Sequence, residues 1–105
     1  MPGSGSKSRK AKPVVWSEQA KEDLERIFVH IADGFTVELA VEITNRLVDG
    51  VEALSCFPRK GSISPNFSGI RELILDSNTV YYRENESDIV IASVRPRRTA
   101  TKKNI

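Results

Sequence analysis

Arginines near the C-terminus are the side chains of this 105-residue chain whose type and spacing most clearly suggest chemistry. The apolar run 89–94 continues directly into Arg95, Arg97 and Arg98, and two lysines follow. A guanidinium group presents planar donors that can bind phosphate or carboxylate in a bidentate way. Pro96 lacks a backbone N–H, so we expect the strand to bend or stop there and the next arginines to project from an irregular edge. The cluster therefore predicts a site for phosphate or a carboxylate-rich partner, or else a charged edge that prevents sheet-to-sheet association.

The remaining reactive side chains do not form a recognisable catalytic or metal-binding set. His30 is the only histidine and Cys56 the only cysteine, so there is no zinc-ligand spacing, internal disulfide or histidine-based triad. We expect His30 to be solvated or at the edge of the core, and Cys56 to pack as a small apolar group. Two sets of acidic residues should lie on the solvent faces of helices: Glu18, Glu22, Asp23 and Glu25, then Glu38, Glu42, Asp49 and Glu52. The sequence therefore predicts no metal and no cofactor.

Two further arginines and two tyrosines precede the terminal cluster. Arg71 begins one predicted strand and Arg83 ends the next. Because the strands of Arg71 and Arg95 should run in the same direction, these two arginines are expected at opposite ends of the sheet, with Arg83 near the end that carries Arg71. Tyr81 and Tyr82 should point to opposite faces, so one packs in the core and the other could offer a stacking surface.

The elements that must position these residues begin with two helices. Residues 12–16 are a short β-branched and aromatic run that predicts a first strand. Ser17 can cap a helix that Gly34 can end by adopting a left-handed conformation, and Thr36 can cap a second helix. The expected apolar faces are Ala20, Leu24, Ile27, Phe28 and Ile31 in the first helix, and Ala40, Ile43, Leu47, Val51 and Leu54 in the second.

The pattern changes to that of strands after Gly69. Three runs rich in β-branched and aromatic residues are separated by polar turns; they are residues 70–75, 79–83 and 89–94. The predicted order is β-α-α-β-β-β, an α+β fold in which an antiparallel sheet packs against an antiparallel helical hairpin. We expect one domain over residues 13–99, preceded by a flexible basic tail, 1–12, and followed by a short tail, 100–105.

Composition excludes several classes of protein. The chain is 39% hydrophobic and 29% charged, as in ordinary globular domains. No apolar run approaches the roughly 18–20 residues that a membrane span needs, and the N-terminus does not resemble a secretory signal, so the cytoplasm is the expected compartment. Residues 13–57 carry nine acidic against three basic side chains, whereas residues 58–105 carry nine basic against five acidic. This separation favours a polyanionic or acidic partner.

Five motifs, taken in order along residues 14–98, resemble those of the ParE/RelE superfamily, the toxins of type II toxin–antitoxin pairs. They are VVWSEQAKEDLERIFVHIA with its A-x-x-D-L-x-x-I pattern, the helix end VEALSCFPRKG, the sheet start GIRELIL, the tyrosine strand VYYREN and the closing strand IVIASVRPRR. The resemblance implies a compact toxin that is neutralised by an antitoxin segment folding on binding, with which it can form a heterotetramer. It also implies a role in growth arrest and plasmid stabilisation.

Two activities occur in the superfamily. RelE-like members cut messenger RNA in the ribosomal A site, and ParE-like members poison DNA gyrase. A RelE-like enzyme would use Arg97 and Arg71 for catalysis, but no tyrosine or histidine follows Arg98. The long helical hairpin and the intact GIREL motif favour the ParE-like activity. We therefore expect a gyrase-binding toxin; an endoribonuclease acting on ribosome-bound message and an inactive nucleic-acid-binding relative are the alternatives.

The ParE-like hypothesis assigns residues to two partners. Target-binding residues would be Arg95, Arg97, Arg98, Arg83 and Tyr82. The antitoxin would occupy an apolar groove beside the helical hairpin and the sheet edge, where it would contact Arg95, Arg97, Leu24 and Phe28.

Overall fold

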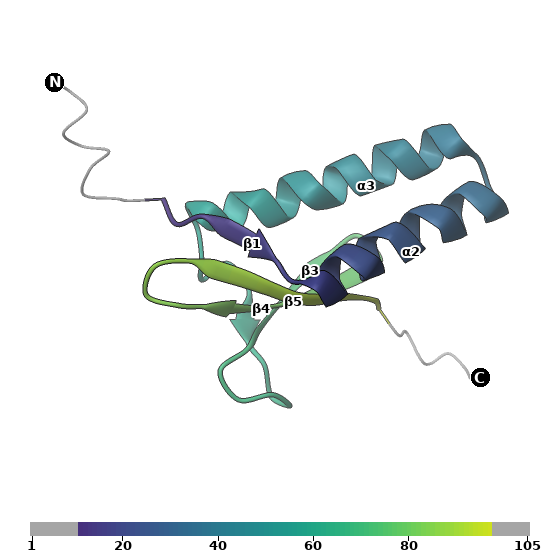
Figure 1. The fold of residues 1–105 in the computed structure, drawn as a ribbon. Helices are drawn as coiled ribbons and strands as arrows, with labels where there is room; N and C mark the ends of the chain where they lie inside the picture. The colour runs from purple at the N-terminus through teal and green to yellow at the C-terminus, as the bar shows by residue number, and fades with distance from the viewer. Residues whose placement is uncertain (1–10, 98–105) are drawn as a thin grey trace, which may run out of the picture.

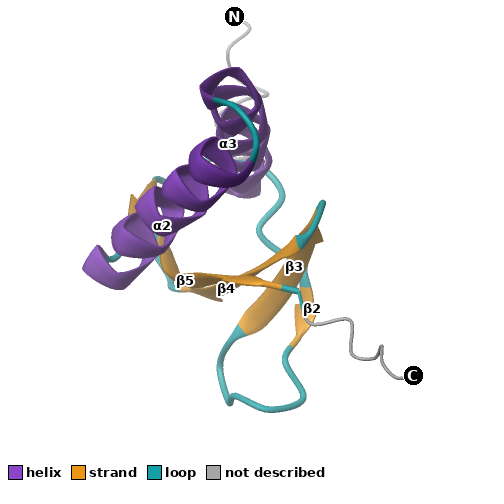
Figure 2. Ribbon diagram, turned by 90° about the vertical axis from the view of Figure 1, so that its right-hand side faces the viewer, coloured by secondary structure: helices purple, strands orange, loops and turns teal. Residues whose placement is uncertain are grey.

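The structure is a computed structural model of the chain, and it describes residues 11–97. Two long helices, α2 (Glu18–Gly34) and α3 (Val37–Glu52), form an antiparallel hairpin followed by the short 3₁₀ helix η1 (Ala53–Ser55). The strands are β1 (Val14–Trp16), β2 (Ser62–Ile63), β3 (Arg71–Leu75), β4 (Asn78–Glu84) and β5 (Ile89–Pro96). Both helices cover the same face of the sheet (Figure 1), and the loop between β2 and β3 lies on the opposite side (Figure 2).

The strands form one five-stranded sheet in the order β1-β5-β4-β3-β2. The last three strands pair antiparallel as a meander, which confirms the predicted α+β fold and its element order. Two features of the sheet were not predicted. The first strand, β1, pairs parallel to β5, and the two-residue strand β2 extends the sheet beyond β3. The sheet is therefore mixed instead of purely antiparallel.

Both predicted helix starts are correct. The Ser17 hydroxyl accepts a hydrogen bond from the Ala20 N–H at 3.0 Å, and the Thr36 hydroxyl accepts one from the Leu39 N–H at 3.0 Å. The predicted end of the first helix at Gly34 is correct, but the left-handed conformation predicted for Gly34 is wrong. Gly34 is the last residue of α2, and in residues 11–97 a positive φ occurs at Gly69 and Asp76 only. The C-cap is Phe35, whose N–H still bonds to the Ile31 carbonyl at 2.8 Å.

The hydrophobic core lies between the helical hairpin and the sheet. Helix α3 and η1 contribute Leu47, Val51 and Leu54, as predicted from the apolar face of the second helix. The sheet contributes Leu73 from β3, Val80 and Tyr82 from β4, and Ile89, Ile91 and Val94 from β5. The main core residues therefore come from α3 and the central strands. In the part of the chain that the structure describes, neither helix is long and apolar enough to cross a membrane.

The predicted tails lie mostly outside the described residues. The exception is Lys12, which was placed in the flexible N-terminal tail but is held by the domain. Its N–H donates to the Ser55 carbonyl at 3.1 Å, and its ammonium group pairs with Glu84 at 2.9 Å. The folded domain therefore includes Lys12. The predicted tail 100–105 is not among the described residues.

Candidate partner-binding surfaces

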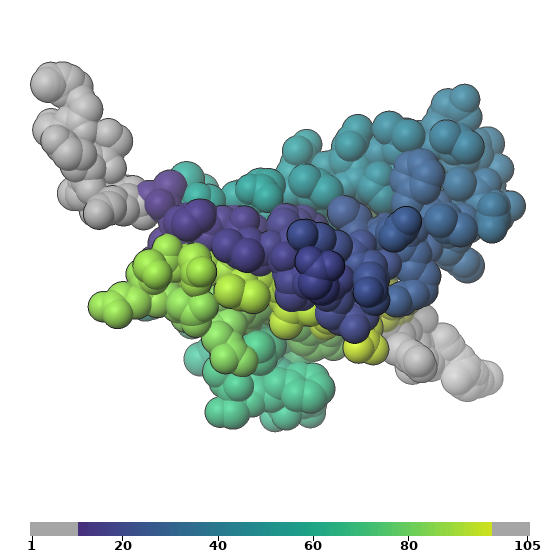
Figure 3. Space-filling model, in the orientation of Figure 1, coloured from purple at the N-terminus to yellow at the C-terminus, as the bar shows by residue number. Residues whose placement is uncertain are grey.

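On the edge away from β4, the end of β5 is held by α2 and not by a neighbouring strand. Strand β1 pairs only with residues 89–91 of β5, so that edge of β5 has no strand partner after Ile91 within the described chain. The start of α2 takes over this role. The Ser17 hydroxyl donates to the Ala92 carbonyl at 3.0 Å, and the Asp23 carboxylate accepts the Val94 N–H at 3.0 Å. Figure 3 shows the end of β5, in yellow, at the surface directly below α2.

Asp23 is one of the residues that the sequence interpretation placed wrongly. It was expected on the solvent face of the helix, but it is only 1% exposed. Its second carboxylate oxygen accepts hydrogen bonds from Gln19 at 2.8 Å and Arg26 at 3.0 Å. Burial raises the pKa of Asp23, but the hydrogen bonds from Val94, Gln19 and Arg26 outweigh this and hold the pKa below its ordinary value. Its position could have been inferred, because Asp23 is three residues after Ala20 and four before Ile27 on the apolar face.

Arg95 and Arg97 lie together at the end of β5, and both are exposed. Arg95 pairs with Thr79 on β4, and the Arg97 N–H donates to the carbonyl of Ser77 in the β3–β4 turn at 2.7 Å. Strand β5 ends at Pro96, as the lack of a proline N–H predicted. Arg98 lies outside the described residues. We call residues 94–97 the β5 exit.

The other two arginines are not part of this group. Arg71 pairs with Tyr82, whereas Arg95 pairs with Thr79 near the other end of β4. The predicted separation of Arg71 from Arg95 is therefore confirmed. The Arg71 guanidinium group donates to the Gly61 carbonyl at 2.7 Å. Arg83 is exposed and directly follows Tyr82, the partner of Arg71, so it lies near Arg71 as predicted. The structure therefore does not bring Arg71 and Arg97 together.

The two tyrosines point to opposite faces of β4, but the assignment of Tyr82 to target binding is wrong. Tyr82 is 0% exposed; its hydroxyl donates to the Pro58 carbonyl at 2.6 Å and accepts the Gly61 N–H at 3.0 Å. Burial raises the pKa of Tyr82. Tyr81 is the tyrosine on the face away from the helices, where its ring meets Phe67 edge to face with centroids 6.0 Å apart.

A cavity of about 360 Å³ lies on that uncovered face, between the sheet and the loop before β3. We call it the outer-face cavity; it is lined by Phe67, Ile70, Tyr81, Ala92, Ser93 and Arg95. It combines two aromatic rings with one guanidinium group from the β5 exit. This composition suits a partner that offers an apolar group next to a carboxylate or phosphate.

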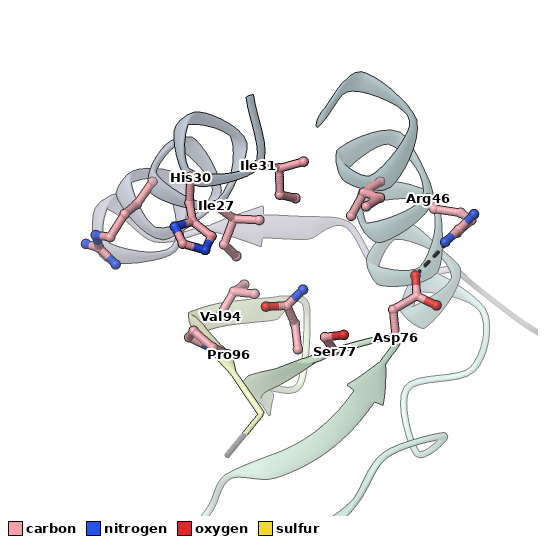
Figure 4. Close-up of a pocket in the computed structure, with 11 residues that line it drawn as sticks. Ile27, His30, Ile31, Arg46, Asp76, Ser77, Val94 and Pro96 are labelled. Carbon is pink, nitrogen blue, oxygen red and sulfur yellow. Dashed lines mark hydrogen bonds and ion pairs between the residues drawn. The ribbon is translucent and has the colours of Figure 1, made fainter. Parts of the chain in front are cut away.

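A larger cavity of about 640 Å³ lies between the hairpin and the sheet (Figure 4). We call it the helix-side groove; its apolar wall consists of Ile27, Ile31, Ile43, Val94 and Pro96. Arg26, Arg46 and His30 supply basic side chains around it, and Arg46 also pairs with Asp76 at 3.3 Å. An apolar groove was predicted beside the hairpin, but its apolar residues from α2 are Ile27 and Ile31 instead of Leu24 and Phe28. Leu24 packs against the core.

Two further predictions concern reactive residues. His30 is exposed and lines the helix-side groove, which agrees with the expectation of a solvated histidine. Cys56 was expected to pack as an apolar group, and this is wrong because Cys56 is exposed. In residues 11–97 no group of three or more acidic, histidine or cysteine side chains is placed to hold a metal ion.

Comparisons with known proteins agree with this architecture. Residues 14–101 match the family described as "ParE toxin of type II toxin-antitoxin system, parDE". The fold is similar to a chain of the chromosomal ParDE toxin–antitoxin system from P. aeruginosa, with a TM-score of 0.76 and 22% identity over 84% of this chain and 98% of that chain. It is also similar to a chain of the RelBE2 toxin–antitoxin complex from Mycobacterium tuberculosis, with a TM-score of 0.63 and 18% identity over 84% and 93% of the two chains. A comparison with curated proteins found no significant match. Because the family match spans most of its length, the chain belongs to the ParE toxin family of type II toxin–antitoxin systems.

Proposed function

We propose that this toxin arrests growth by binding DNA gyrase in the cytoplasm, and that it does so without catalysing a reaction. The observation that carries the proposal is the position of Arg95 and Arg97. They are exposed together at the β5 exit, whereas Arg71 lies at the other end of the sheet with its guanidinium group bonded to the Gly61 carbonyl. This arrangement favours a binding surface over a catalytic pair.

A ribonuclease would need more than positive charge at this place. Cleavage by the 2′-hydroxyl requires a group that accepts its proton and one that protonates the leaving oxygen. The histidine lies beside the helix-side groove, on the other side of the sheet from the outer-face cavity. Glu72, a carboxylate on the uncovered face, accepts a hydrogen bond from the Ser64 hydroxyl at 2.7 Å. These positions do not favour proton transfer beside Arg95 and Arg97.

The surface around Arg95 has the composition of a protein-binding site. Arginine and aromatic side chains are enriched among the residues that contribute most to binding energy at protein interfaces. Arg95 borders the outer-face cavity, in which Tyr81 and Phe67 supply the aromatic surface. We infer that this cavity receives an apolar side chain of the target, while Arg95 and Arg97 bind carboxylates next to it.

Purified toxin and gyrase provide the test. The toxin should inhibit supercoiling of relaxed plasmid, and Arg95→Ala/Arg97→Ala should weaken inhibition by about tenfold or more, the size expected for central arginines of an interface. The matched control is Arg59→Ala/Lys60→Ala, which removes the same charge from an exposed turn elsewhere and should inhibit like the wild type.

Three results would contradict the proposal. The wild type could leave supercoiling unaffected, or the two double variants could lose activity equally, which would indicate a general charge effect. Codon-spaced cuts in translated message after induction, detected by primer extension, would instead support the endoribonuclease alternative.

We also infer that the antitoxin occupies the helix-side groove and reaches the β5 exit. The apolar wall of the groove lies beside Arg26, Arg46 and His30, so the groove suits an amphipathic segment with acidic residues. Val94 and Pro96 belong to this wall and flank Arg95 in sequence. An antitoxin in the groove would therefore lie close to the arginines that we assign to the target.

A further inference from the structure

We propose that Asp23 is a positioning residue for target binding: it acts as the missing edge partner of β5 and fixes the direction in which Arg95 and Arg97 leave the sheet. The part of this inference that concerns the target rests on the function proposed above. The part that concerns the backbone of β5 does not depend on it.

The first step is the edge of β5. This strand has 8 residues, but its parallel neighbour β1 has only 3 and reaches no further than Ile91. Beyond that point the backbone groups on this edge need other partners, because an unpaired buried N–H is costly. The Val94 N–H is the buried donor at this edge, and Asp23 accepts it at 3.0 Å.

The second step is the proline. N–H groups two residues apart on a strand point to the same edge. After Val94, the next residue whose N–H would point to the edge that faces α2 is therefore Pro96. Proline has no N–H to satisfy, so this position beyond the reach of β1 needs no acceptor. Asp23 is therefore the last acceptor that this edge of β5 receives from α2 in the described structure.

The third step is the rigidity of Asp23 itself. One carboxylate oxygen is used by Val94, and the other is held by Gln19 and Arg26 from the same helix. Gln19 is four residues before Asp23 and Arg26 three residues after it, so both bonds lie along the helix surface. The carboxylate is thus fixed relative to α2, and through Val94 it fixes β5 relative to α2.

The fourth step connects the anchor to the arginines. Val94 directly precedes Arg95, and on the other edge of the strand the Arg97 N–H is held by the Ser77 carbonyl. The β5 exit is therefore held on two edges, by α2 on one and by β4 and the β3–β4 turn on the other. If the hydrogen bond between Asp23 and Val94 is removed, the side chains of Arg95 and Arg97 can adopt more directions. Ordering them on binding then lowers the affinity for the target.

The test uses the full-length toxin with Asp23→Ala and Asp23→Asn. In Asp23→Asn the side-chain carbonyl can still accept a hydrogen bond from the Val94 N–H, so this variant should retain more activity than Asp23→Ala. If Asp23→Ala does not fold, the comparison is made with Asp23→Asn. The stability control is Leu54→Ala, which removes a fully buried side chain next to Ser55, the residue that bonds to Lys12 at the end of the sheet where β5 begins. Growth arrest under graded induction measures potency without assuming a target, and circular dichroism sets a temperature at which all the variants are folded.

Two results are expected from a positioning role. The Val94 amide in Asp23→Ala should exchange with solvent about tenfold faster or more, while the Val80 amide in the core changes less. Growth arrest by Asp23→Ala should require about tenfold more toxin than growth arrest by the wild type. This loss of potency should be greater than that of Leu54→Ala.

The inference is wrong if Val94 exchange is unchanged in Asp23→Ala, or if Asp23→Ala is no weaker than Leu54→Ala when both are folded. Supercoiling inhibition is measured in parallel with the wild type. A wild type that arrests growth without inhibiting gyrase would remove the proposed target and leave the positioning test intact.

Discussion

At the scale of single residues, the hydroxyl of Tyr82 shows how a buried polar group fixes a loop. It bonds to both the Pro58 carbonyl and the Gly61 N–H, two groups of the segment between η1 and β2. Gly61 is required at this place, because a Cβ atom would lie 2.7 Å from the Glu72 carbonyl oxygen and 2.8 Å from the Tyr82 hydroxyl. The loop therefore packs against the end of β4 because the Tyr82 hydroxyl bonds to it and because Gly61 has no side chain to prevent the close approach.

Removing that hydroxyl should destabilise the domain. Tyr82→Phe leaves a buried carbonyl and a buried N–H without their partner, so we expect the free energy of unfolding to fall by about 1–3 kcal/mol in urea denaturation. The matched control is Tyr81→Phe, which removes the same atom from the half-buried tyrosine on the outer face and should change stability by less than about 0.5 kcal/mol. Equal losses in the two variants would show that the Tyr82 hydrogen bonds do not stabilise the loop.

Residue types alone identified the arginines of the β5 exit but not the residues that support them. Arg95 and Arg97 stand out because several cations follow an apolar run. Asp23 did not stand out, since an acidic residue in the first turns of a helix is ordinarily a favourable partner of the helix dipole. Its true role depends on a hydrogen bond to Val94, 71 residues away in sequence. Such a long-range contact leaves no local pattern, although the place of Asp23 on the apolar face was a signal.

At the scale of elements, two carboxylates connect segments that are distant in sequence. Asp23 connects α2 to β5, and Glu84 at the end of β4 bonds to Lys12 before β1 and to Arg59 before β2. The hydrogen bond from Lys12 is the main cause that lowers the pKa of Glu84. Both carboxylates therefore have a lower pKa in the folded protein than their ordinary values of about 3.9 for Asp and 4.3 for Glu.

This gives a prediction for the pH dependence of stability. A carboxylate whose folded pKa is depressed stabilises the protein above its unfolded pKa, and the contribution is lost as pH falls through the folded pKa. The free energy of unfolding should therefore be nearly constant from pH 7 to about pH 5 and fall steeply below about pH 4. Urea denaturation across this range measures it. Asp23→Asn should show a shallower fall than the wild type, and an identical fall would contradict the assignment of Asp23 as a main contributor.

The elements could be predicted as far as their signals are local. Ser17 and Thr36 were recognised as helix caps because the capping bond spans three residues, and the meander was recognised from turns between β-branched runs. The parallel pairing of β1 with β5 depends on contacts between the two ends of the domain, so no short pattern encodes it. The same limit applies to Tyr82, because alternation shows that Tyr81 and Tyr82 oppose each other but not which one faces the helices.

At the scale of the whole molecule, the end of β5 belongs to both candidate binding surfaces. Val94 and Pro96 line the helix-side groove, whereas Arg95 between them lines the outer-face cavity. This follows from the alternation of side chains along a strand. Arg26 adds a second link, because it lines the groove and also bonds to Asp23. A partner in the groove therefore contacts the same segment that presents Arg95 and Arg97.

This arrangement predicts that neutralisation and toxicity can be separated by mutation. Ile31→Glu places a charge in the apolar wall of the helix-side groove, where it should repel an acidic antitoxin segment and remove apolar contact. We expect antitoxin affinity, measured by calorimetry, to fall by about 10- to 100-fold, or about 1.4–2.8 kcal/mol. Toxicity should persist, because Ile31 is not among the residues of the outer-face cavity.

The control is Val29→Glu, which makes the same change on the same helix at a residue that is 49% exposed and is not part of the groove. Cells that produce this variant should be rescued by the antitoxin like cells with the wild type, whereas cells with Ile31→Glu should continue to arrest. If both variants bind the antitoxin with wild-type affinity, the groove is not its binding site. If Ile31→Glu is folded but no longer toxic, the two surfaces are not independent, and the β5 exit would then have to change with the groove.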